Sequence, residues 1–259
     1  MALSVEQKKN VEEALRLNLQ KRFEKYNPEP ASMPFHTRLL GKDRLALYSF
    51  LHSLTTNFGT SIFEPVALAL AKSTFRRAET QYVSGKTMSI ESQRVIQDIM
   101  DGLTAAHVSP NKTEEIEKIR MVCQSGEMKK VKPTRVDLFL ESNEGDVCLI
   151  DIKTAKPNAG AFKEFKRTLL EWVAVTLAQN PGASIQTLVA IPYNPYEPKQ
   201  YNRWTMRGML DLEKELKVAA EFWDFLAGRG TYEDLLVCFE HVGIEMREEI
   251  DSYFQRFRS

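Results

Sequence analysis

The chain has 259 residues, and its 35 basic and 35 acidic side chains cancel. With 43% hydrophobic and 27% charged residues, the composition argues against a disordered or fibrous chain and allows a sizeable core. No apolar run approaches the roughly 20 residues that a membrane span requires. The first residues predict an amphipathic helix and lack the apolar core of a signal peptide. Three widely spaced cysteines indicate reduced thiols, so we expect a cytoplasmic protein.

The neutral sum hides an uneven distribution of charge. Twelve acidic side chains and only four basic ones lie between Asp211 and Asp251, whereas residues 1–210 carry a net charge of +6. A local basic face can bind phosphate inside a neutral protein, and an acidic helical tail can equally be a solvated surface. Charge alone therefore does not decide whether the protein binds nucleic acid.

Helical patterns dominate the first half of the chain. Pro65 suits the first turn of a helix, and Pro110 and Asn111 mark the start of another. Prolines 28, 30 and 34 break the pattern that precedes them. We expect helices over residues 4–25, 42–57, 65–83, 89–106 and 112–124.

Strand patterns begin after Lys132. Residues 134–141 alternate apolar and polar side chains, residues 147–152 are almost continuously apolar, and a short polar turn joins them, which predicts a β-hairpin. A helix over about 160–179 and a third strand over 184–192 follow. After a polar loop over 193–204 the chain reads as helical, with a capping box at Thr231 starting the penultimate helix.

This order of elements predicts an α/β or α+β fold, a small mixed β-sheet flanked by helices. We expect a single domain over residues 1–259. Its parts are a mainly helical region (1–125), a sheet core (133–193), and a loop with C-terminal helices (194–259).

The triplet Asp151-Ile152-Lys153 is the sharpest local feature. Five other acidic-x-Lys triplets lie in helical or polar stretches, but this one ends an apolar strand. Residues two apart on a strand project from the same side, and Asp137 on the preceding strand can bring a second carboxylate there. A carboxylate buried in such a run requires a cation or a hydrogen-bond partner.

Two carboxylates and a lysine at one strand end would suit Mg²⁺, which takes oxygen ligands and keeps several waters. Such an ion lowers the pKa of bound water, and Lys153 would orient that water or neutralise charge in the transition state. The alternative is a structural ion pair between Asp151 and Lys153, with Asp137 capping a turn.

These residues resemble a known signature. Pro133 to Asp137, thirteen intervening residues and then Asp151-Ile152-Lys153 look like the PD-(D/E)xK nuclease motif, although here the proline stands four residues before the first aspartate. In that family the two acidic residues bind Mg²⁺ and the lysine assists the attacking water. The resemblance implies the restriction-endonuclease-like fold, with helix-rich N- and C-terminal elaborations.

A second resemblance covers roughly residues 60–250. Its landmarks are similar to those of the TdeIII-like group of type II restriction endonucleases. They are Phe63–Pro65, Val136–Leu138, Asp151–Asn158, Pro192–Tyr196 with Arg203–Thr205, and Glu221–Phe225. It implies Mg²⁺-dependent cleavage of double-stranded DNA by a homodimer, at a short palindrome of the GC-rich GGNCC type. The products would carry 5′-phosphate and 3′-hydroxyl ends.

Glu64 is a further candidate for the catalytic site. In related nucleases a glutamate from an early helix often completes the metal site or orients a metal-bound water. The alternative is a carboxylate that merely favours the dipole at a helix N-terminus.

Basic and polar residues near the site are candidates for DNA binding. A basic helix face beside the metal would grip phosphates, and arginine and amide side chains of the following loop would read bases, Arg203 and Arg207 first. Each could instead be a solvated surface residue. The candidates are Lys156, Asn158, Lys163, Lys166, Arg167, Lys199, Asn202, Arg203 and Arg207.

Other chemistries have little support. The histidines and cysteines lack the spacing of zinc ligands, and no phosphate-binding glycine loop is present, so we expect no nucleotide cofactor. Three alternatives stay open: a structure-selective repair nuclease of the same fold, an inert DNA-binding domain, and an enzyme that uses Lys153 for Schiff-base chemistry.

Overall fold

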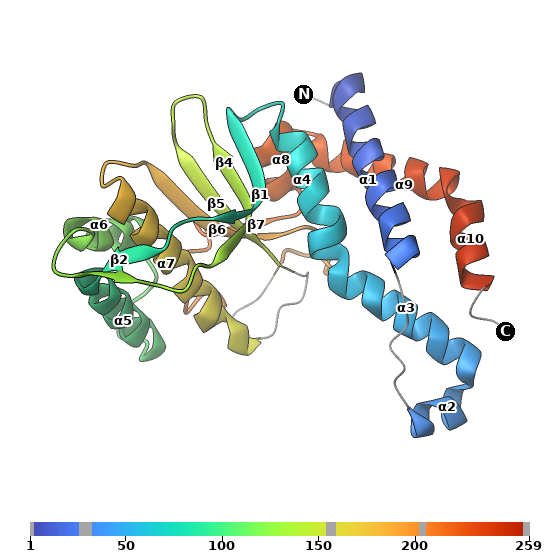
Figure 1. The fold of residues 1–259 in the computed structure, drawn as a ribbon, viewed down its shortest axis with the longest axis horizontal. Coiled ribbons are helices and arrows are strands. Elements are labelled where there is room, and N and C mark those ends of the chain that lie inside the picture. Colours follow the sequence, from blue (N-terminus) through green and yellow to red (C-terminus); the bar gives the residue numbers. More distant parts are fainter. Residues whose placement is uncertain (1–2, 26–32, 154–158, 202–205, 256–259) are drawn as a thin grey trace.

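The computed structural model describes residues 3–25, 33–153, 159–201 and 206–255 (Figure 1). Its helices are α1 (Val5–Lys25), α2 (Pro34–Leu40), α3 (Lys42–Phe58), the π-helical η1 (Gly59–Phe63), α4 (Glu64–Ala71), α5 (Ile90–Thr104), α6 (Lys112–Val122), the short 3₁₀ helix η2 (Ala159–Ala161), α7 (Phe162–Gln179), α8 (Ala220–Ala227), α9 (Thr231–Glu245) and α10 (Arg247–Gln255). Its strands are β1 (Arg77–Val83), β2 (Thr87–Ser89), β3 (Met128–Lys130), β4 (Arg135–Glu141), β5 (Val147–Ile152), β6 (Ile185–Ile191) and β7 (Leu216–Val218).

The main sheet is mixed, as predicted. Its five strands follow the order β1-β4-β5-β6-β7, and β2 pairs with β3 in a separate two-stranded sheet. The predicted hairpin is confirmed, because β4 and β5 are antiparallel, with Leu138 opposite Ile150. Strand β6 runs parallel to β5, which requires a crossover, and α7 provides it.

Two hydrophobic cores cover the two faces of this sheet. Helices α5, α6 and α7 pack on one face, and α1, α4, α8 and α9 pack on the other (Figure 1). Consecutive residues of β5 face opposite cores: Leu149 packs on the α7 side and Ile150 on the α4 side. The central strands are therefore buried on both faces, which explains the almost continuous apolar run of β5.

The structure differs from the predicted local structure in three ways. The helix expected over 65–83 ends at Ala71, and residues 77–83 form β1, because pairing along β4 outweighs a local helical pattern. Strands β2, β3 and β7 were missed because each has only three residues, too few to show a period. At α9, Gly230 takes the N-cap position with a φ of 89°, and the Thr231 hydroxyl donates to the Gly228 carbonyl, so Thr231 forms no capping box.

The first and last parts of the chain meet on the α4 side of the sheet. Helix α1 buries Val11 and Leu15 against α4 and α9. Helix α2 and the start of α3 extend away from this body (Figure 1). In the described part of the chain, no helix combines the length and the apolar character that crossing a membrane would demand.

Candidate active site

The hairpin of β4 and β5 brings Asp137, Asp151 and Lys153 together. The Ile152 backbone N–H donates to Asp137 Oδ2 at 2.9 Å, so Asp137 reaches across to the neighbouring strand. Lys153 Nζ lies 2.6 Å from Asp151 Oδ1, and the Lys153 backbone N–H still pairs with the Ala190 carbonyl of β6. The ion pair of the structural alternative is thus present, but Asp137 does not cap a turn: it belongs to the same cluster.

Glu64, the first residue of α4, joins this cluster beside Gln81 of β1. It is 3% exposed, and its Oε2 accepts a hydrogen bond of 2.9 Å from Gln81 Nε2. The helix-dipole alternative does not account for Glu64, because the preceding residue Phe63 is itself helical and ends the π-helical η1. Glu64 therefore lies inside a continuous helical stretch rather than at a free N-terminus, and π-helical turns occur often at functional sites.

The cluster carries more negative charge than its one lysine balances. Burial, reinforced by the charges of Asp151 and Glu64, raises the pKa of Asp137 to about 7, despite the hydrogen bond from Ile152. Asp137 and Asp151 also lie within hydrogen-bonding reach of each other, which favours a proton on Asp137. Burial likewise raises the pKa of Glu64. Such an arrangement requires either a proton or an added cation.

The donor set fits a hard divalent cation. Asp137, Asp151 and Glu64 offer carboxylate oxygens, the ligands that Mg²⁺ prefers. Among the residues that the structure describes, no three His, Cys, Asp or Glu side chains are already arranged around a common point as metal ligands. Instead, the Lys153 ammonium neutralises Asp151, and burial together with the charges of the neighbouring carboxylates raises the pKa of Asp137. Asp137 and Asp151 would hold a metal, with Glu64 beside them.

Lys153 lies at the solvent-exposed edge of the cluster. Its side chain is 30% exposed, unlike that of Asp151, and its Nζ lies 4.9 Å from the centre of the Phe165 ring. This cation–π contact with α7 restricts the ammonium group to the neighbourhood of Asp151. Lys153 thus bridges the buried carboxylates and the solvent.

The basic face predicted for α7 is divided by the structure. Lys163 is exposed, and Arg167 is partly exposed and donates to Gln97 Oε1 at 2.8 Å. Lys166, however, is fully buried and forms ion pairs with Glu115 and Glu215. Its assignment to a phosphate-binding face is wrong, because its charge is already neutralised inside the protein.

The predicted base-reading loop is partly described. The Asn194 side chain donates to the Lys199 carbonyl at 2.7 Å, and the Lys199 N–H donates to the Tyr196 carbonyl, so this part of the loop folds back on itself. Arg207 is exposed. The other candidates lie outside the described residues, namely Lys156, Asn158, Asn202 and Arg203.

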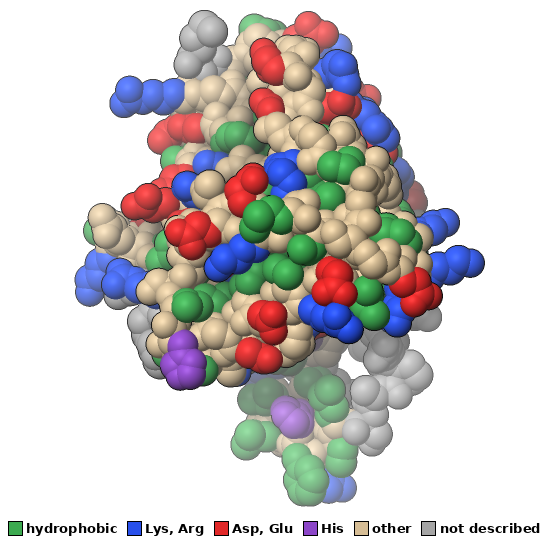
Figure 2. All heavy atoms as spheres, turned by 90° about the vertical axis from the view of Figure 1, so that its left-hand side faces the viewer, with side chains coloured by type: hydrophobic (Ala, Val, Ile, Leu, Met, Phe, Trp, Pro, Cys, Tyr) green, Lys and Arg blue, Asp and Glu red, His purple; other side chains and the backbone are tan. Residues whose placement is uncertain are grey.

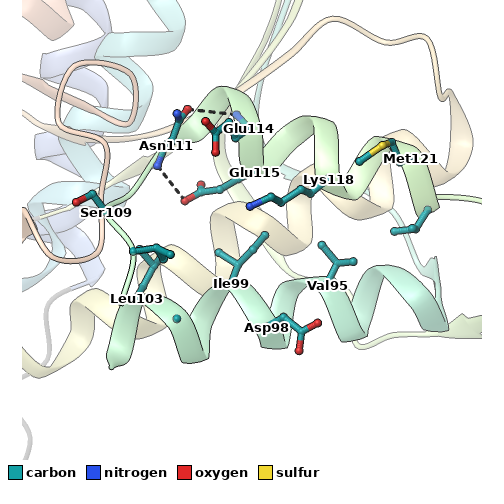
Figure 3. Close-up of a pocket in the computed structure, with 13 residues that line it drawn as sticks. Val95, Asp98, Ile99, Leu103, Ser109, Asn111, Glu114, Glu115, Lys118 and Met121 are labelled. Atoms are coloured by element: carbon teal, nitrogen blue, oxygen red, sulfur yellow. Dashed lines mark hydrogen bonds between the residues drawn. The ribbon is translucent and has the colours of Figure 1, made fainter. Parts of the chain in front are cut away.

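A separate cavity of about 440 Å³ lies between α5 and α6 (Figure 3). Ile99 and Leu103 of α5 face it, and Asn111 caps α6 beside it by accepting a hydrogen bond from the Glu114 N–H. None of its lining residues belongs to β4 or β5, so it is distinct from the carboxylate cluster. Figure 2 views this end of the molecule and shows acidic and basic side chains interspersed with hydrophobic ones, unlike the uniform basic surface that binds nucleic acid.

Sequence reasoning missed Gln81, because it fell in a stretch that was expected to be helical. It also missed a second group of buried ions. In this group, Lys112 and Lys166 contact Glu215, and Lys166 also contacts Glu115. These residues come from three distant segments, so no short motif could have joined them.

Comparison with known proteins gives consistent matches over most of the chain. Residues 3–243, which include the whole carboxylate cluster, match the family described as "Type II restriction endonuclease, HinfI". The chain is 25% identical over 222 residues to type II restriction enzyme HgiEI of Herpetosiphon aurantiacus, covering 84% of this chain and 79% of that protein. It is 26% identical over 238 residues to type II restriction enzyme MjaII of Methanocaldococcus jannaschii, covering 81% of this chain and 63% of that protein.

Proposed function

Because the chain belongs to the HinfI family of type II restriction endonucleases and is thus an enzyme that cleaves DNA, we propose that the carboxylate cluster is its active site. In this proposal it hydrolyses double-stranded DNA with Mg²⁺ at a short, GC-rich palindrome and leaves 5′-phosphate and 3′-hydroxyl ends. The PD-(D/E)xK and TdeIII-like resemblances support these finer points. One observation carries the proposal: the buried carboxylates of Glu64 and Asp151 and the partly buried carboxylate of Asp137 meet one lysine where β5 ends.

Each residue of the cluster has a distinct role in this proposal. Asp137 and Asp151 hold the metal, and Glu64 completes the site or orients a water. Bound Mg²⁺ would lower the pKa of a water and stabilise charge on the phosphate. The Ile152 N–H fixes one oxygen of Asp137. Lys153, partly exposed to solvent and in contact with Phe165, orients the attacking water and offsets charge as it develops.

DNA would approach over the solvent-exposed side of Lys153. In this proposal Lys163 and Arg167 of α7, together with Lys156 and Asn158, contact phosphates near the cleaved bond. The loop after β6 reads bases through Asn202, Arg203 and Arg207, with Lys199 beside them.

A palindrome has two-fold symmetry, so we propose that the enzyme acts as a homodimer with one active site for each strand. Exposed apolar side chains support it: Phe35 and Leu39 of α2 are 82% and 84% exposed. Such a patch rarely stays in water unless a partner covers it. Exposed arginines on α2 and α3 also complement the acidic surface of α9 and α10, which a second copy would supply. Light scattering should show a dimer that Leu39→Lys converts to a monomer. If the wild type were a monomer that cuts both strands, the proposal of a homodimer would be wrong, but the proposed activity would stand.

The proposed activity is tested by cleavage of unmethylated phage DNA with Mg²⁺ or with EDTA. We expect discrete, Mg²⁺-dependent bands, and sequencing of their ends gives the site and the end chemistry. Asp151→Ala should abolish cleavage and retain DNA binding in a gel-shift assay. Asp146→Ala is the matched control, because Asp146 is exposed in the turn that precedes β5. Full cleavage by Asp151→Ala would sink the assignment, and cleavage confined to branched DNA would favour a structure-selective nuclease.

A further inference from the structure

Gln81 interrupts β1 beside the carboxylate cluster. Its φ of 54° lies in the left-handed region that favours glycine, which is unusual for a long side chain within a strand. The neighbours Thr80 and Tyr82 pair with Leu138 and Val136, whereas Gln81 forms no pair with Asp137, the residue that this register places opposite it. A residue held in such a conformation persists only where its surroundings require it, and such residues cluster at functional sites.

Strand β4 is irregular at the same position. Leu138 and Leu140 pack in the core on the α4 side, and Phe139 packs on the α7 side, as alternation demands. Val136 also packs on the α7 side, although uninterrupted alternation would place it with Leu138. The change of face occurs at Asp137, so the two irregular residues, Gln81 and Asp137, lie opposite each other on neighbouring strands.

The irregular backbone of Gln81 accompanies a specific contact. Its side-chain amide donates to Glu64 Oε2 at 2.9 Å, and among the described residues this is the hydrogen bond that fixes the Glu64 carboxylate. Gln81 is neutral, so it can orient a carboxylate without cancelling its charge. The contact between Lys153 and Asp151 differs, because the ammonium group both orients the Asp151 carboxylate and neutralises its charge. The hydrogen bond from Gln81 thus orients Glu64 without supplying a positive charge, which leaves that charge to be supplied by a cation.

We propose that Gln81 is a positioning residue for the cleavage reaction: its strained backbone directs the amide to Glu64 and holds that carboxylate beside Asp137 and Asp151. This inference rests on the proposed function, because it acts through Glu64. It also offers a functional explanation for the left-handed conformation of Gln81, because this conformation occurs together with the hydrogen bond to Glu64.

Gln81→Gly separates the two roles of the residue. Glycine relieves the strain of the positive φ but removes the hydrogen bond to Glu64, and because these two effects oppose each other the melting temperature should change little. The kcat at saturating Mg²⁺ should fall by about 10- to 100-fold, as expected when a catalytic group is misplaced by about 1 Å, while the KM for DNA stays unchanged. Gln81→Asn tolerates the same φ but is one methylene shorter, so it should also lose activity without losing stability.

A double-mutant cycle with Glu64→Gln gives the decisive readout. If Gln81 acts through Glu64, adding Gln81→Gly to Glu64→Gln should cause no further loss of kcat. Losses that multiply, or wild-type kcat in Gln81→Gly, would overturn the positioning role. A separate experiment tests the proposed function: if Asp151→Ala still cleaves DNA, the proposed active site is wrong. If Asp151→Ala is inactive and Gln81→Gly is fully active, only the inference about Gln81 falls.

Discussion

Two groups of buried ions in this protein use the same kinds of side chain for different ends. The carboxylate cluster consists of Glu64, Asp137, Asp151 and Lys153. The paired-ion cluster consists of Lys112, Glu115, Lys166 and Glu215. Both bury two carboxylates, which would be unstable alone, but Lys112 and Lys166 are buried as well whereas the Lys153 side chain is 30% exposed. They differ in charge balance.

The paired-ion cluster is balanced, with two lysines and two glutamates. Lys112 Nζ lies 2.8 Å from Glu215 Oε1, and Lys166 Nζ lies 2.6 Å from Glu215 Oε2. The Asp211 backbone N–H also donates to Glu215 Oε2 at 2.9 Å. Burial by itself would raise the pKa of Glu215, but the two ammonium groups outweigh it and hold the pKa below its ordinary value. These contacts join α6 and α7 to the segment before β7.

The carboxylate cluster is unbalanced, and the effect on its acids is opposite. The pKa values of Glu64 and Asp137 are raised, because burial is not offset by enough positive charge. Burial is common to both groups, so burial does not distinguish a structural ion cluster from a functional one. The excess of negative charge does, because it leaves a deficit that a divalent cation can fill.

The largest effect that we predict is on the paired-ion cluster. Lys166→Met should lower the free energy of unfolding by about 3 to 5 kcal/mol, because it leaves Glu115 without its lysine and Glu215 with only one. Urea denaturation at pH 7 measures this change. Lys163→Met, three residues earlier on the same helix and exposed, should change it by less than about 0.5 kcal/mol.

A second variant shows whether the loss arises from unpaired charge. Adding Glu115→Gln to Lys166→Met removes one of the stranded carboxylates, and Glu215 keeps Lys112 as its partner. The double variant should therefore recover part of the lost stability. An equal or greater loss would mean that packing, rather than charge balance, holds this region together.

The contrast also shows what a sequence can reveal. Asp137, Asp151 and Lys153 belong to one hairpin, so alternation and a strand-end position were enough to bring them together. The paired-ion cluster combines α6, α7 and the segment before β7, and no local pattern connects these. The burial of Lys166 could nevertheless have been predicted from the sequence. Lys166 lies four residues after Phe162 and three before Leu169, so it shares a helical face with these two buried residues. A lysine on an apolar face indicates a buried partner rather than a phosphate.

Much of the fold was also predictable, and the misses share a cause. The three central strands show alternation in β4 and apolar runs in β5 and β6, and these strands and the long helices α1, α3, α5, α6 and α7 lie where they were expected. Strand β1 and the short strand β7 depend on pairing with strands far away in the sequence, as does the contact of Gln81 with Glu64. Elements defined by distant partners leave little local pattern in the residues that form them.

The next prediction concerns the charge excess of the carboxylate cluster. In the metal-free protein the pKa of Asp137 is about 7, above its ordinary value of 3.8. Between about pH 4 and pH 7, the folded state therefore holds a proton on Asp137 that the unfolded state has lost. The contribution of Asp137 to stability is therefore complete below about pH 4 and is lost as the pH rises through 7, up to about 4 kcal/mol.

Asp137→Asn removes this titration. In EDTA, the variant should be more stable than the wild type at pH 8, and its stability should fall less between pH 5 and pH 8. Asp146→Asn, at an exposed position, should keep the wild-type slope. Parallel curves for Asp137→Asn and the wild type, measured by urea denaturation at several pH values, would show that the cluster is already neutralised and would remove the contrast with the paired-ion cluster.

The smallest effect separates two lysines on one helix. Lys163 is exposed and Lys166 is buried, so their variants should change different properties. If Lys163 contacts a phosphate, Lys163→Gln should weaken DNA binding a few-fold and lower the slope of log K against log salt by about one, at unchanged stability. Lys118→Gln on α6, beside the cavity, is the matched control and should keep the wild-type slope. Binding measured by fluorescence anisotropy from 50 to 200 mM salt decides the point. An unchanged slope for Lys163→Gln would leave the exposed face of α7 as solvated surface, and the phosphate contacts would have to come from elsewhere in the chain.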